Sequence, residues 1–309
     1  ELIGGSPGEM GRVWRKLVPS SGVQGLRKDY LRGMGFTDLT GTRAPKWLCD
    51  GSAKPVALGW VPYPSLEAET QHTQIEGGTG TGKSQAIKCL IAEALERGDR
   101  LVCIDGGGDL FTTFSGVAGA VTRLDVMDPN CATKWSPMKE IEHPADWAQL
   151  ATGIIGQGSG DGAEWRAMGR ALFSSVGEGY AAACKEAGRA FSNREFYDLL
   201  MGAPEDALAP FVQGTPAAAL IGNQKGLSSV RMSLLDPLAF FKYLPDTPLE
   251  AGFSARGWMR ETMKGSSGQR ALFLTFKKRD LATTRSLISG LIDLLISTAV
   301  DEGKSDKRI

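Results

Sequence analysis

The chain has 309 residues, of which 42% are hydrophobic and 23% charged, and its 35 basic and 35 acidic side chains give a formal net charge of zero. These proportions are ordinary for a soluble globular protein, and they exclude a chain whose overall charge would attract nucleic acid or a membrane surface. The five cysteines form no Cys-x-x-Cys pair and no zinc-binding spacing, so we expect free, buried thiols.

Residues 1–60 are rich in Gly, Pro and charged side chains and show little periodicity. They hold nine Lys or Arg against five Asp or Glu. We predict an irregular, membrane-proximal linker, because positive charge next to a membrane favours the cytoplasmic side. A solvated linker without a membrane role fits the same composition.

Residues 61–132 alternate turns, short strands and one helix, as in the first part of an α/β domain. Gly98 is placed to end the helix. The continuous apolar run 101–104 is typical of a buried parallel strand. One face of the predicted helix carries Ile87, Leu90, Ile91, Ala94 and Leu95.

Residues 133–252 change character and predict a separate all-α domain. Trp147, Leu150 and Ile154 mark one helix, and Trp165, Leu172 and Val176 fall at the spacing of another. Ser192 and Glu195 read as a capping box at the start of a third. A further helix is indicated by Leu227, Val230 and Leu234.

Residues 253–309 return to the α/β pattern. A strand is predicted over 271–276, and an amphipathic helix by the spacing of Leu287, Leu291 and Leu294. Gly290 and Asp293 interrupt this apolar stretch, so we do not expect it to span a bilayer. The chain as a whole is predicted to be α/β.

Residues 77–84 satisfy the P-loop pattern Gly-x4-Gly-Lys-Ser/Thr. Glycines allow successive backbone N–H groups to turn toward a polyphosphate, and the start of the following helix adds its positive dipole end. Lys83 is positioned to reach the β- and γ-phosphates, and the Ser84 hydroxyl to ligate Mg²⁺. The predicted ATP-binding residues are Gly77, Gly78, Thr79, Gly80, Thr81, Gly82, Lys83, Ser84 and Gln85.

Asp105 follows the apolar run 101–104, as the acid of a Walker B strand would. In many P-loop motors, however, the Walker B strand comes much later and ends in Asp-Glu. No strand-like apolar run of this chain ends that way. Either Asp105 holds the metal or the Walker B strand is missing, and spacing alone does not decide between them.

Several stretches in order resemble the type IV secretion coupling proteins, the TraD/TrwB family of conjugation. The resemblance covers about residues 55–309 and is carried by 71–84, 97–109, 164–172, 253–259 and 270–275. It implies a RecA-like sheet with an all-α domain inserted after the first strands. The domains are then 61–132 and 253–309, the two parts of a nucleotide-binding domain, with 133–252 between them.

The family resemblance also implies a function. Members form hexameric rings at the cytoplasmic face of the bacterial inner membrane, held by an N-terminal anchor that we expect upstream of Glu1. They use ATP and Mg²⁺ to drive single-stranded DNA, with its relaxase, into the secretion channel. The family's Walker B strand follows the helix predicted over 285–300, so we expect it beyond Ile309. Asp105 is then a second acid near the nucleotide, and the fragment alone is not expected to hydrolyse ATP.

The chain departs from the family pattern at two places. Gly106, Gly107 and Gly108 follow Asp105 where relatives often have Pro-x-Gly, which puts the contacts of that turn in doubt. Gln71 stands where relatives often carry Arg, so a nucleotide contact at that position is lost or replaced.

Basic side chains outside the P-loop are candidates for DNA or for a neighbouring subunit. Lys277 and Lys278 come directly after a predicted strand and are candidate pore contacts, although a solvated loop fits the same residues. Lys225 and Arg231 are candidates for completing a neighbour's ATP site. Two other functions stay open: a coupling receptor mainly for protein effectors, and an unrelated P-loop kinase or other NTPase.

Overall fold

The computed structural model describes residues 57–58, 61–62, 69, 72–117, 121–158, 160–246, 252–264 and 268–303. The predicted linker over 1–60 lies almost wholly outside these residues, as does Gln71. The chain divides into two compact units, residues 1–101 with 116–118, and residues 102–115 with 119–309.

The first unit holds a small hairpin and the helix that follows the P-loop. β1 (Ala57–Leu58) pairs antiparallel with β2 (Val61–Pro62), and α3 spans Lys83–Arg97. Gly98, with φ 88°, donates its N–H to the carbonyls of Ala94 and Leu95 and ends α3 as predicted. Ile87 is exposed, so the buried face of α3 begins one turn later than expected.

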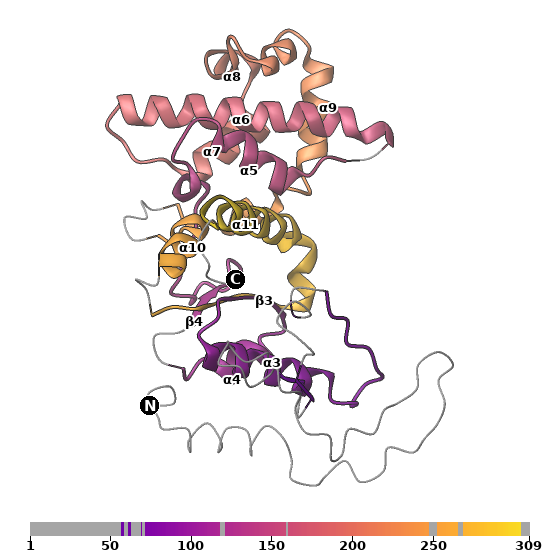
Figure 1. Ribbon diagram of the computed structural model, residues 1–309. Helices are drawn as coiled ribbons and strands as arrows, with labels where there is room; N and C mark the ends of the chain where they lie inside the picture. The colour runs from indigo at the N-terminus through magenta and orange to yellow at the C-terminus, as the bar shows by residue number, and fades with distance from the viewer. Residues whose placement is uncertain are drawn as a thin grey trace. The chain divides into compact units, whose positions relative to one another are not determined.

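The second unit contains a three-stranded sheet made of β3 (Leu101–Gly106), β4 (Val121–Leu124) and β5 (Ala271–Phe276). β5 lies in the middle and is buried along its whole length. It runs parallel to β4, with Leu124 opposite Leu274. The sheet with helices on its faces confirms the α/β class (Figure 1).

β3 is only partly buried, contrary to the expectation for residues 101–104. Val102 is 36% exposed and Ile104 is 51% exposed. β3 is an edge strand of the described sheet, with β5 on one side. Its even-numbered side chains therefore lack the cover that a central strand has on both faces.

Helices cover both faces of this sheet (Figure 1). α4 (Asp109–Phe114) lies on one face, where the Phe111 and Phe114 rings meet Phe273 at 6.0 and 6.4 Å between centroids. α10 (Ala255–Lys264) and α11 (Leu281–Glu302) lie on the other.

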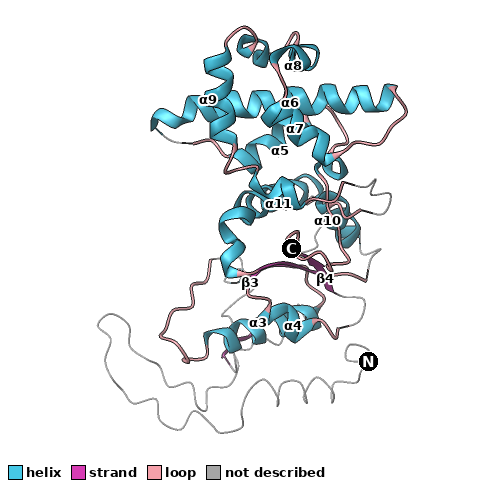
Figure 2. Ribbon diagram, turned by 180° about the vertical axis from the view of Figure 1, so that it is seen from behind, coloured by secondary structure: helices cyan, strands magenta, loops and turns pink. Residues whose placement is uncertain are grey.

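The remaining helices form a layer on α11, seen from behind in Figure 2. Between residues 133 and 246 the described chain consists of helices and connecting loops without a strand, apart from an isolated bridge between Trp135 and Phe253. The boundaries of the inserted domain stay a prediction, because these helices share one compact unit with the sheet. The helices are α5 (Asp146–Ile155), α6 (Ala163–Glu186), α7 (Asn193–Gly202), α8 (Glu205–Val212) and α9 (Gln224–Leu234), with short 3₁₀ turns at Pro137–Glu140, Gly160–Gly162, Pro216–Leu220, Ala239–Tyr243 and Lys278–Asp280.

Two close approaches depend on glycine. A Cβ at Gly177 of α6 would lie 2.4 Å from the Trp147 ring of α5. At the crossing of α5 and α11, a Cβ at Gly153 would lie 2.9 Å from the Cα of Gly290. Helix surfaces meet this closely only where small residues stand at the contact.

The capping box predicted at Ser192 forms on one side only. The Ser192 hydroxyl accepts the Glu195 N–H at 3.0 Å and starts α7. The Glu195 carboxylate instead accepts hydrogen bonds from Tyr180 and Arg189, both at 2.6 Å. A charged donor outside the helix, Arg189, thus takes the place of the backbone N–H that would complete the capping box.

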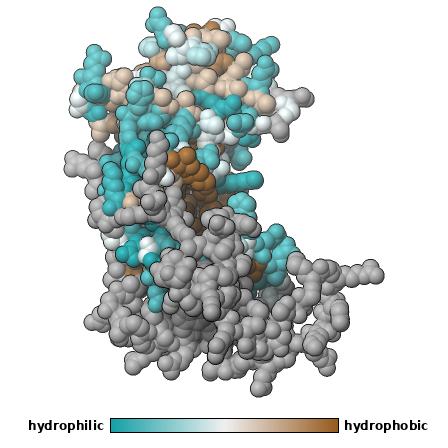
Figure 3. All heavy atoms as spheres, viewed as in Figure 1, coloured by the Kyte–Doolittle hydropathy of each residue, from teal (hydrophilic) through white to brown (hydrophobic). Residues whose placement is uncertain are grey.

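α11 with its preceding turn, Lys278–Glu302, is the one helix of the described residues that is long and apolar enough to cross a membrane by length and composition. Leu287, Leu291 and Leu294 of α11 are buried in the hydrophobic core. The opposite side leaves Ile296 and Val300 exposed, and hydrophobic surface is visible at the level of α11 in Figure 3. Burial of these leucines is typical of a helix that packs in a protein core.

Candidate functional site

The P-loop of the first unit is an exposed turn shaped by glycine. Gly80 and Gly82 have φ of 81° and 89°, which only glycine adopts readily. A Cβ at Gly77 would lie 2.5 Å from Thr81 Oγ1, so a side chain at this position would displace the Thr81 hydroxyl. The Thr81 hydroxyl donates to the Gly78 carbonyl at 2.8 Å and closes the turn.

Lys83 lies inside this turn. Its Nζ donates to the carbonyls of Gly77 and Gly78, each at 2.6 Å. The ammonium is therefore held within the loop, where polyphosphate oxygens would compete for it. The charge and the position both fit a phosphate cradle.

The start of α3 provides further donors for an anion. Its N-cap is Gly82, which has no side chain to accept a first-turn N–H. Ser84 and Gln85 stand exposed in that turn. The free N–H groups, the dipole and the Ser84 hydroxyl fit a nucleotide phosphate with its Mg²⁺.

The segment before the P-loop is not a strand. Residues 72–76, directly before the P-loop, have no regular secondary structure in the described chain. Ile75 is the only large apolar side chain there, so the segment has little to bury against a sheet.

Asp105, in the second unit, makes a hydrogen bond to a nearby backbone group. It is 5% exposed, and its Oδ2 accepts the Phe111 N–H at 2.8 Å in the first turn of α4. Gly107 and Gly108, with φ of 136° and 81°, make the turn between strand and helix. The glycines that replace the family's Pro-x-Gly thus form an ordered turn in which Asp105 caps α4.

Cys103 lies on the less exposed side of β3, the side that also carries Asp105. Burial, with a smaller contribution from the Asp105 charge, raises the pKa of the Cys103 thiol to about 12. This thiol is therefore little ionised at neutral pH. The four described cysteines are free as expected, and Cys89, Cys131 and Cys184 are buried, whereas Cys103 is only half-buried.

A polar cluster at the end of β4 and β5 was missed from the sequence. Arg123 donates to Thr275 Oγ1 at 2.9 Å, to Asp128 at 2.8 Å and to Asp125 at 3.0 Å. The Thr275 hydroxyl donates to Asp125 at 3.0 Å. The guanidinium also lies 5.3 Å from the centre of the Phe111 ring. The cluster links two parallel strands at the edge of an α/β sheet where ligands usually bind.

Glu140 is a further residue that the sequence did not reveal. It is fully buried, and its carboxylate accepts hydrogen bonds from Trp135 Nε1, Ser254 Oγ and the N–H groups of Ala255 and Arg256. Burial raises the pKa of this carboxyl, while the hydrogen bonds oppose that shift. Glu140 thereby links two segments of the chain. One leads into the helical layer and contains Trp135, and the other is the start of α10, where the chain has left that layer.

The basic candidates outside the P-loop fall into two groups. Lys277, Lys278 and Lys225 are exposed. Arg231 is half-buried and donates to the carbonyls of Leu200 at 2.8 Å and Ala203 at 2.5 Å. Arg231 therefore holds the C-terminal end of α7 in this chain.

Among the residues that the structure describes, no group of three or more His, Cys, Asp or Glu side chains is placed to hold a metal. For a metal ion that accompanies a nucleotide at the P-loop, the Ser84 hydroxyl is a protein ligand of suitable chemistry. Phosphate oxygens commonly supply other ligands of such an ion.

Comparison with known proteins places the chain in one family. The model of the type IV secretion-system coupling protein DNA-binding domain matches residues 55–308. Coupling protein TraD of Escherichia coli (strain K12) is 24% identical over 296 residues, which are 94% of this chain and 40% of TraD.

Solved structures of the coupling protein TrwB are similar in fold and are 30% identical in sequence. The unbound form gives a TM-score of 0.69, covering 85% of this chain and 59% of that one. TrwB in complex with the non-hydrolysable ATP analogue ADPNP gives 0.68, and TrwB in complex with ADP and Mg²⁺ gives 0.69. The chain thus spans about 40–60% of the relatives it matches. With the P-loop and the α/β sheet in place, this chain belongs to the family of type IV secretion-system coupling proteins.

Proposed function

We propose that the chain is part of a conjugative coupling ATPase. Such a protein binds ATP and Mg²⁺ and uses hydrolysis to drive single-stranded DNA, with its relaxase, into a secretion channel. The observation that carries the proposal is the P-loop with Lys83 held in its centre. The nucleotide complexes of TrwB support the same ligands here. Family membership removes the unrelated kinase from consideration.

Binding of the triphosphate exchanges hydrogen bonds at Lys83. Its ammonium leaves the carbonyls of Gly77 and Gly78 and contacts the β- and γ-phosphates, where it offsets the charge that develops in phosphoryl transfer. The N–H groups of residues 78–84 would hold the phosphates, and the Ser84 hydroxyl would ligate Mg²⁺. Asp105 accepts the Phe111 N–H at the start of α4. From the family resemblance alone, we assign it the role of a second acid and not that of the main Mg²⁺ ligand.

Assembly and location follow from the family and are part of the proposal. We expect a homo-hexamer on the cytoplasmic face of the inner membrane, in contact with the relaxosome and channel proteins. The nucleotide-binding parts are 61–132 and 253–309, and residues 133–252 form the inserted helical domain. Lys277 and Lys278 are proposed DNA contacts. Lys225 is a proposed contact to a neighbour's site, whereas the capping role of Arg231 leaves it less free for this.

The test is steady-state ATP hydrolysis by the full-length protein with Mg²⁺ and single-stranded DNA. Lys83→Ala is expected to abolish turnover, while Lys88→Ala in the same helix leaves it within about twofold. Hydrolysis by Lys83→Ala at the wild-type rate would exclude this site. The 309-residue chain by itself is expected to be inactive. DNA-stimulated turnover by this chain that is lost in Asp105→Asn would instead make Asp105 the Walker B acid.

A further inference from the structure

Two turns of the second unit meet beside the neighbouring strands β3 and β5. The acidic turn is residues 105–108, which begin with Asp105, and the basic turn is residues 277–279, directly after β5. The Gly107 N–H donates to the Phe276 carbonyl at 2.9 Å. Phe276 is the last residue of β5, so a single backbone hydrogen bond joins the acidic turn to the residue that precedes the basic turn.

A second connection between the same turns runs through side chains. Thr275, one residue before Phe276, is buried, and its hydroxyl accepts the Arg123 Nε–H at 2.9 Å. The Arg123 guanidinium lies 5.3 Å from the centre of the Phe111 ring. The Phe111 N–H in turn donates to Asp105 Oδ2 at 2.8 Å. Both connections therefore start at the end of β5 and end at the acidic turn.

Arg123 is the member of the second connection whose hydrogen bonds depend on both sides of it. Its side chain is 30% exposed, and it donates to Asp125 at 3.0 Å and to Asp128 at 2.8 Å as well as to Thr275. The Thr275 hydroxyl gives its only proton to Asp125, at 3.0 Å. One guanidinium thus serves two carboxylates and a hydroxyl. A shift of Thr275 therefore changes the bonds that hold the guanidinium over Phe111.

We propose that Arg123 is a positioning residue through which DNA bound at the basic turn acts on Asp105. DNA at this turn shifts the end of β5, and Arg123 carries the shift through the Phe111 ring to the acidic turn. The packed strands leave little free space that could absorb it. The inference rests on the function proposed above, which gives the basic turn its DNA and Asp105 its role, and it adds a route by which DNA regulates ATP turnover.

The first measurement is hydrogen–deuterium exchange of the full-length protein with and without a twenty-residue oligo(dT), followed by mass spectrometry over residues 105–114. We expect oligo(dT) to change the exchange rate of this segment about threefold or more in wild type and less than about 1.5-fold in Arg123→Met. Arg123→Met keeps a long side chain against Phe111 and removes the hydrogen bonds. Thr275→Val, which keeps the branched shape and loses the hydroxyl, should behave in the same way.

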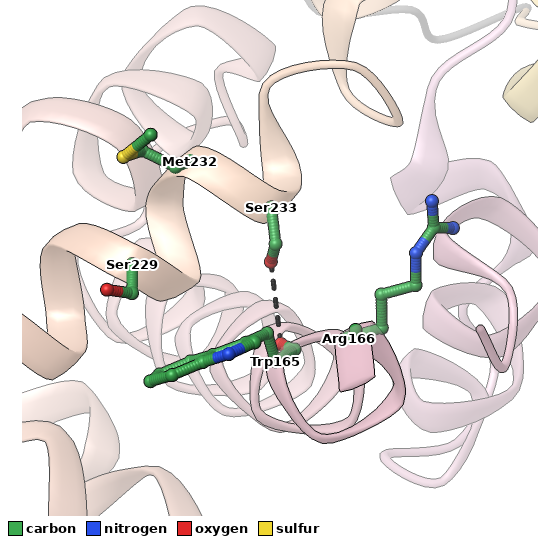
Figure 4. A pocket seen from close by; sticks show the side chains of 6 residues that line it. Trp165, Arg166, Ser229, Met232 and Ser233 are labelled. Carbon is green, nitrogen blue, oxygen red and sulfur yellow. Dashed lines mark hydrogen bonds between the residues drawn. The ribbon is translucent and has the colours of Figure 1, made fainter. Parts of the chain in front are cut away.

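Two variants in the same unit serve as matched controls. Arg260→Met removes an arginine of similar exposure, 31%, that also bonds two carboxylates. Ser233→Ala removes a hydroxyl that donates from one helix to another, to the Trp165 carbonyl at 3.4 Å (Figure 4). Both should keep the exchange response, because these bonds lie outside the two turns. Arg123→Lys, which keeps the charge and loses the planar fork, should lose the response, whereas a purely electrostatic anchor would be restored.

The second measurement is steady-state ATP hydrolysis by the same proteins. Arg123→Met should lower the stimulation of kcat by oligo(dT) about fivefold or more, with the KM for ATP and the affinity for oligo(dT) within about twofold of wild type. A general loss of folded structure would change all of these quantities together. Stimulation that is unchanged in Arg123→Met, or that falls only in step with the affinity for oligo(dT), would overturn the proposal.

The exchange measurement also separates this proposal from the ATPase. It needs no hydrolysis, so it decides on Arg123 even if wild type fails to turn over ATP and the proposed function is wrong. A wild-type segment 105–114 that does not respond to oligo(dT) would overturn the coupling. A response that persists in Lys277→Ala/Lys278→Ala would overturn it as well, because the signal would then start outside the basic turn.

Discussion

The carboxylate of Glu140 accepts a 2.7 Å hydrogen bond from the indole Nε1 of Trp135, five residues earlier in the chain. The same carboxylate accepts the Ala255 N–H, 115 residues later, also at 2.7 Å. All of these groups are buried. One side chain thus satisfies donors from both segments that connect the helical layer to the rest of its unit.

Replacement of Glu140 is predicted to be strongly destabilising. Glu140→Ala leaves the Trp135 indole and the first N–H groups of α10 buried without an acceptor, at about 1–3 kcal/mol for each group. We expect a loss of about 3–5 kcal/mol of unfolding free energy, measured by urea denaturation. Glu140→Gln keeps one acceptor and should lose less. Glu186→Gln, at an exposed position of α6, should change stability by less than about 0.5 kcal/mol, and equal effects in the three variants would contradict the role of Glu140.

A side chain at Gly177 is predicted to disrupt the contact between α5 and α6. Its Cβ would lie 2.4 and 2.6 Å from two ring atoms of Trp147, far inside van der Waals contact. The higher helix propensity of alanine offsets about 1 kcal/mol at most, so Gly177→Ala should lower the free energy of unfolding by about 1–3 kcal/mol. Gly202→Ala in α7, where a Cβ meets nothing within 4 Å, should be neutral or stabilising. Thermal denaturation of both variants distinguishes a steric effect from a general intolerance of alanine.

The sequence predicted the local features of this molecule and missed the distant ones. The P-loop, the end of α3 at Gly98 and the cap at Ser192 each depend on residues within a few positions of one another, so spacing identifies them. The partners of Glu140 are separated by more than a hundred residues, and no local pattern marks that carboxylate. The exposure of Ile104 was missed for a related reason, because an apolar run does not say whether its strand lies in the middle of a sheet.

Arg231 is predicted to act on stability through the end of α7. Its guanidinium supplies donors to the Leu200 and Ala203 carbonyls, which α7 leaves without helical partners. Arg231→Ala should therefore lower the free energy of unfolding by about 1–3 kcal/mol. Arg194→Ala, which removes an exposed ion pair with Asp198, should cost less than about 0.5 kcal/mol. If Arg231→Ala leaves stability unchanged but abolishes ATP hydrolysis, a role toward a neighbouring subunit is the better account.

The DNA contacts proposed for Lys277 and Lys278 predict a change in salt dependence. Each phosphate contact that is lost reduces the slope of log affinity against log salt by about 0.7 for single strands. The double variant Lys277→Ala/Lys278→Ala should therefore flatten the slope by about 1.4 when oligo(dT) binding is titrated by anisotropy. Lys185→Ala/Lys242→Ala removes the same charge from exposed positions in the helical layer. An equal effect of both pairs would indicate a general charge effect.

The raised pKa of Cys103 predicts slow alkylation with a defined pH dependence. With a pKa of about 12, little thiolate is present at pH 8, and its amount rises with pH up to that value. Iodoacetamide should react on the order of tens of times more slowly at Cys103 in the folded protein than in the urea-unfolded chain, followed by mass spectrometry. Asp105→Asn removes the smaller of the two causes and should accelerate the reaction modestly. Equal rates in the folded and unfolded protein would show that Cys103 is accessible and ordinary.

The glycine crossing of α5 and α11 has a mechanical consequence. At Gly153 and Gly290 the two backbones meet without an intervening layer of side chains that could compress or slide. α11 begins just after β5, at the end of the sheet that carries Thr275 and the basic turn 277–279. A displacement at this end of the sheet would therefore be transmitted through α11 to α5 with little local compression. The contact of α5 and α11 thus couples the end of β5 mechanically to the helical layer.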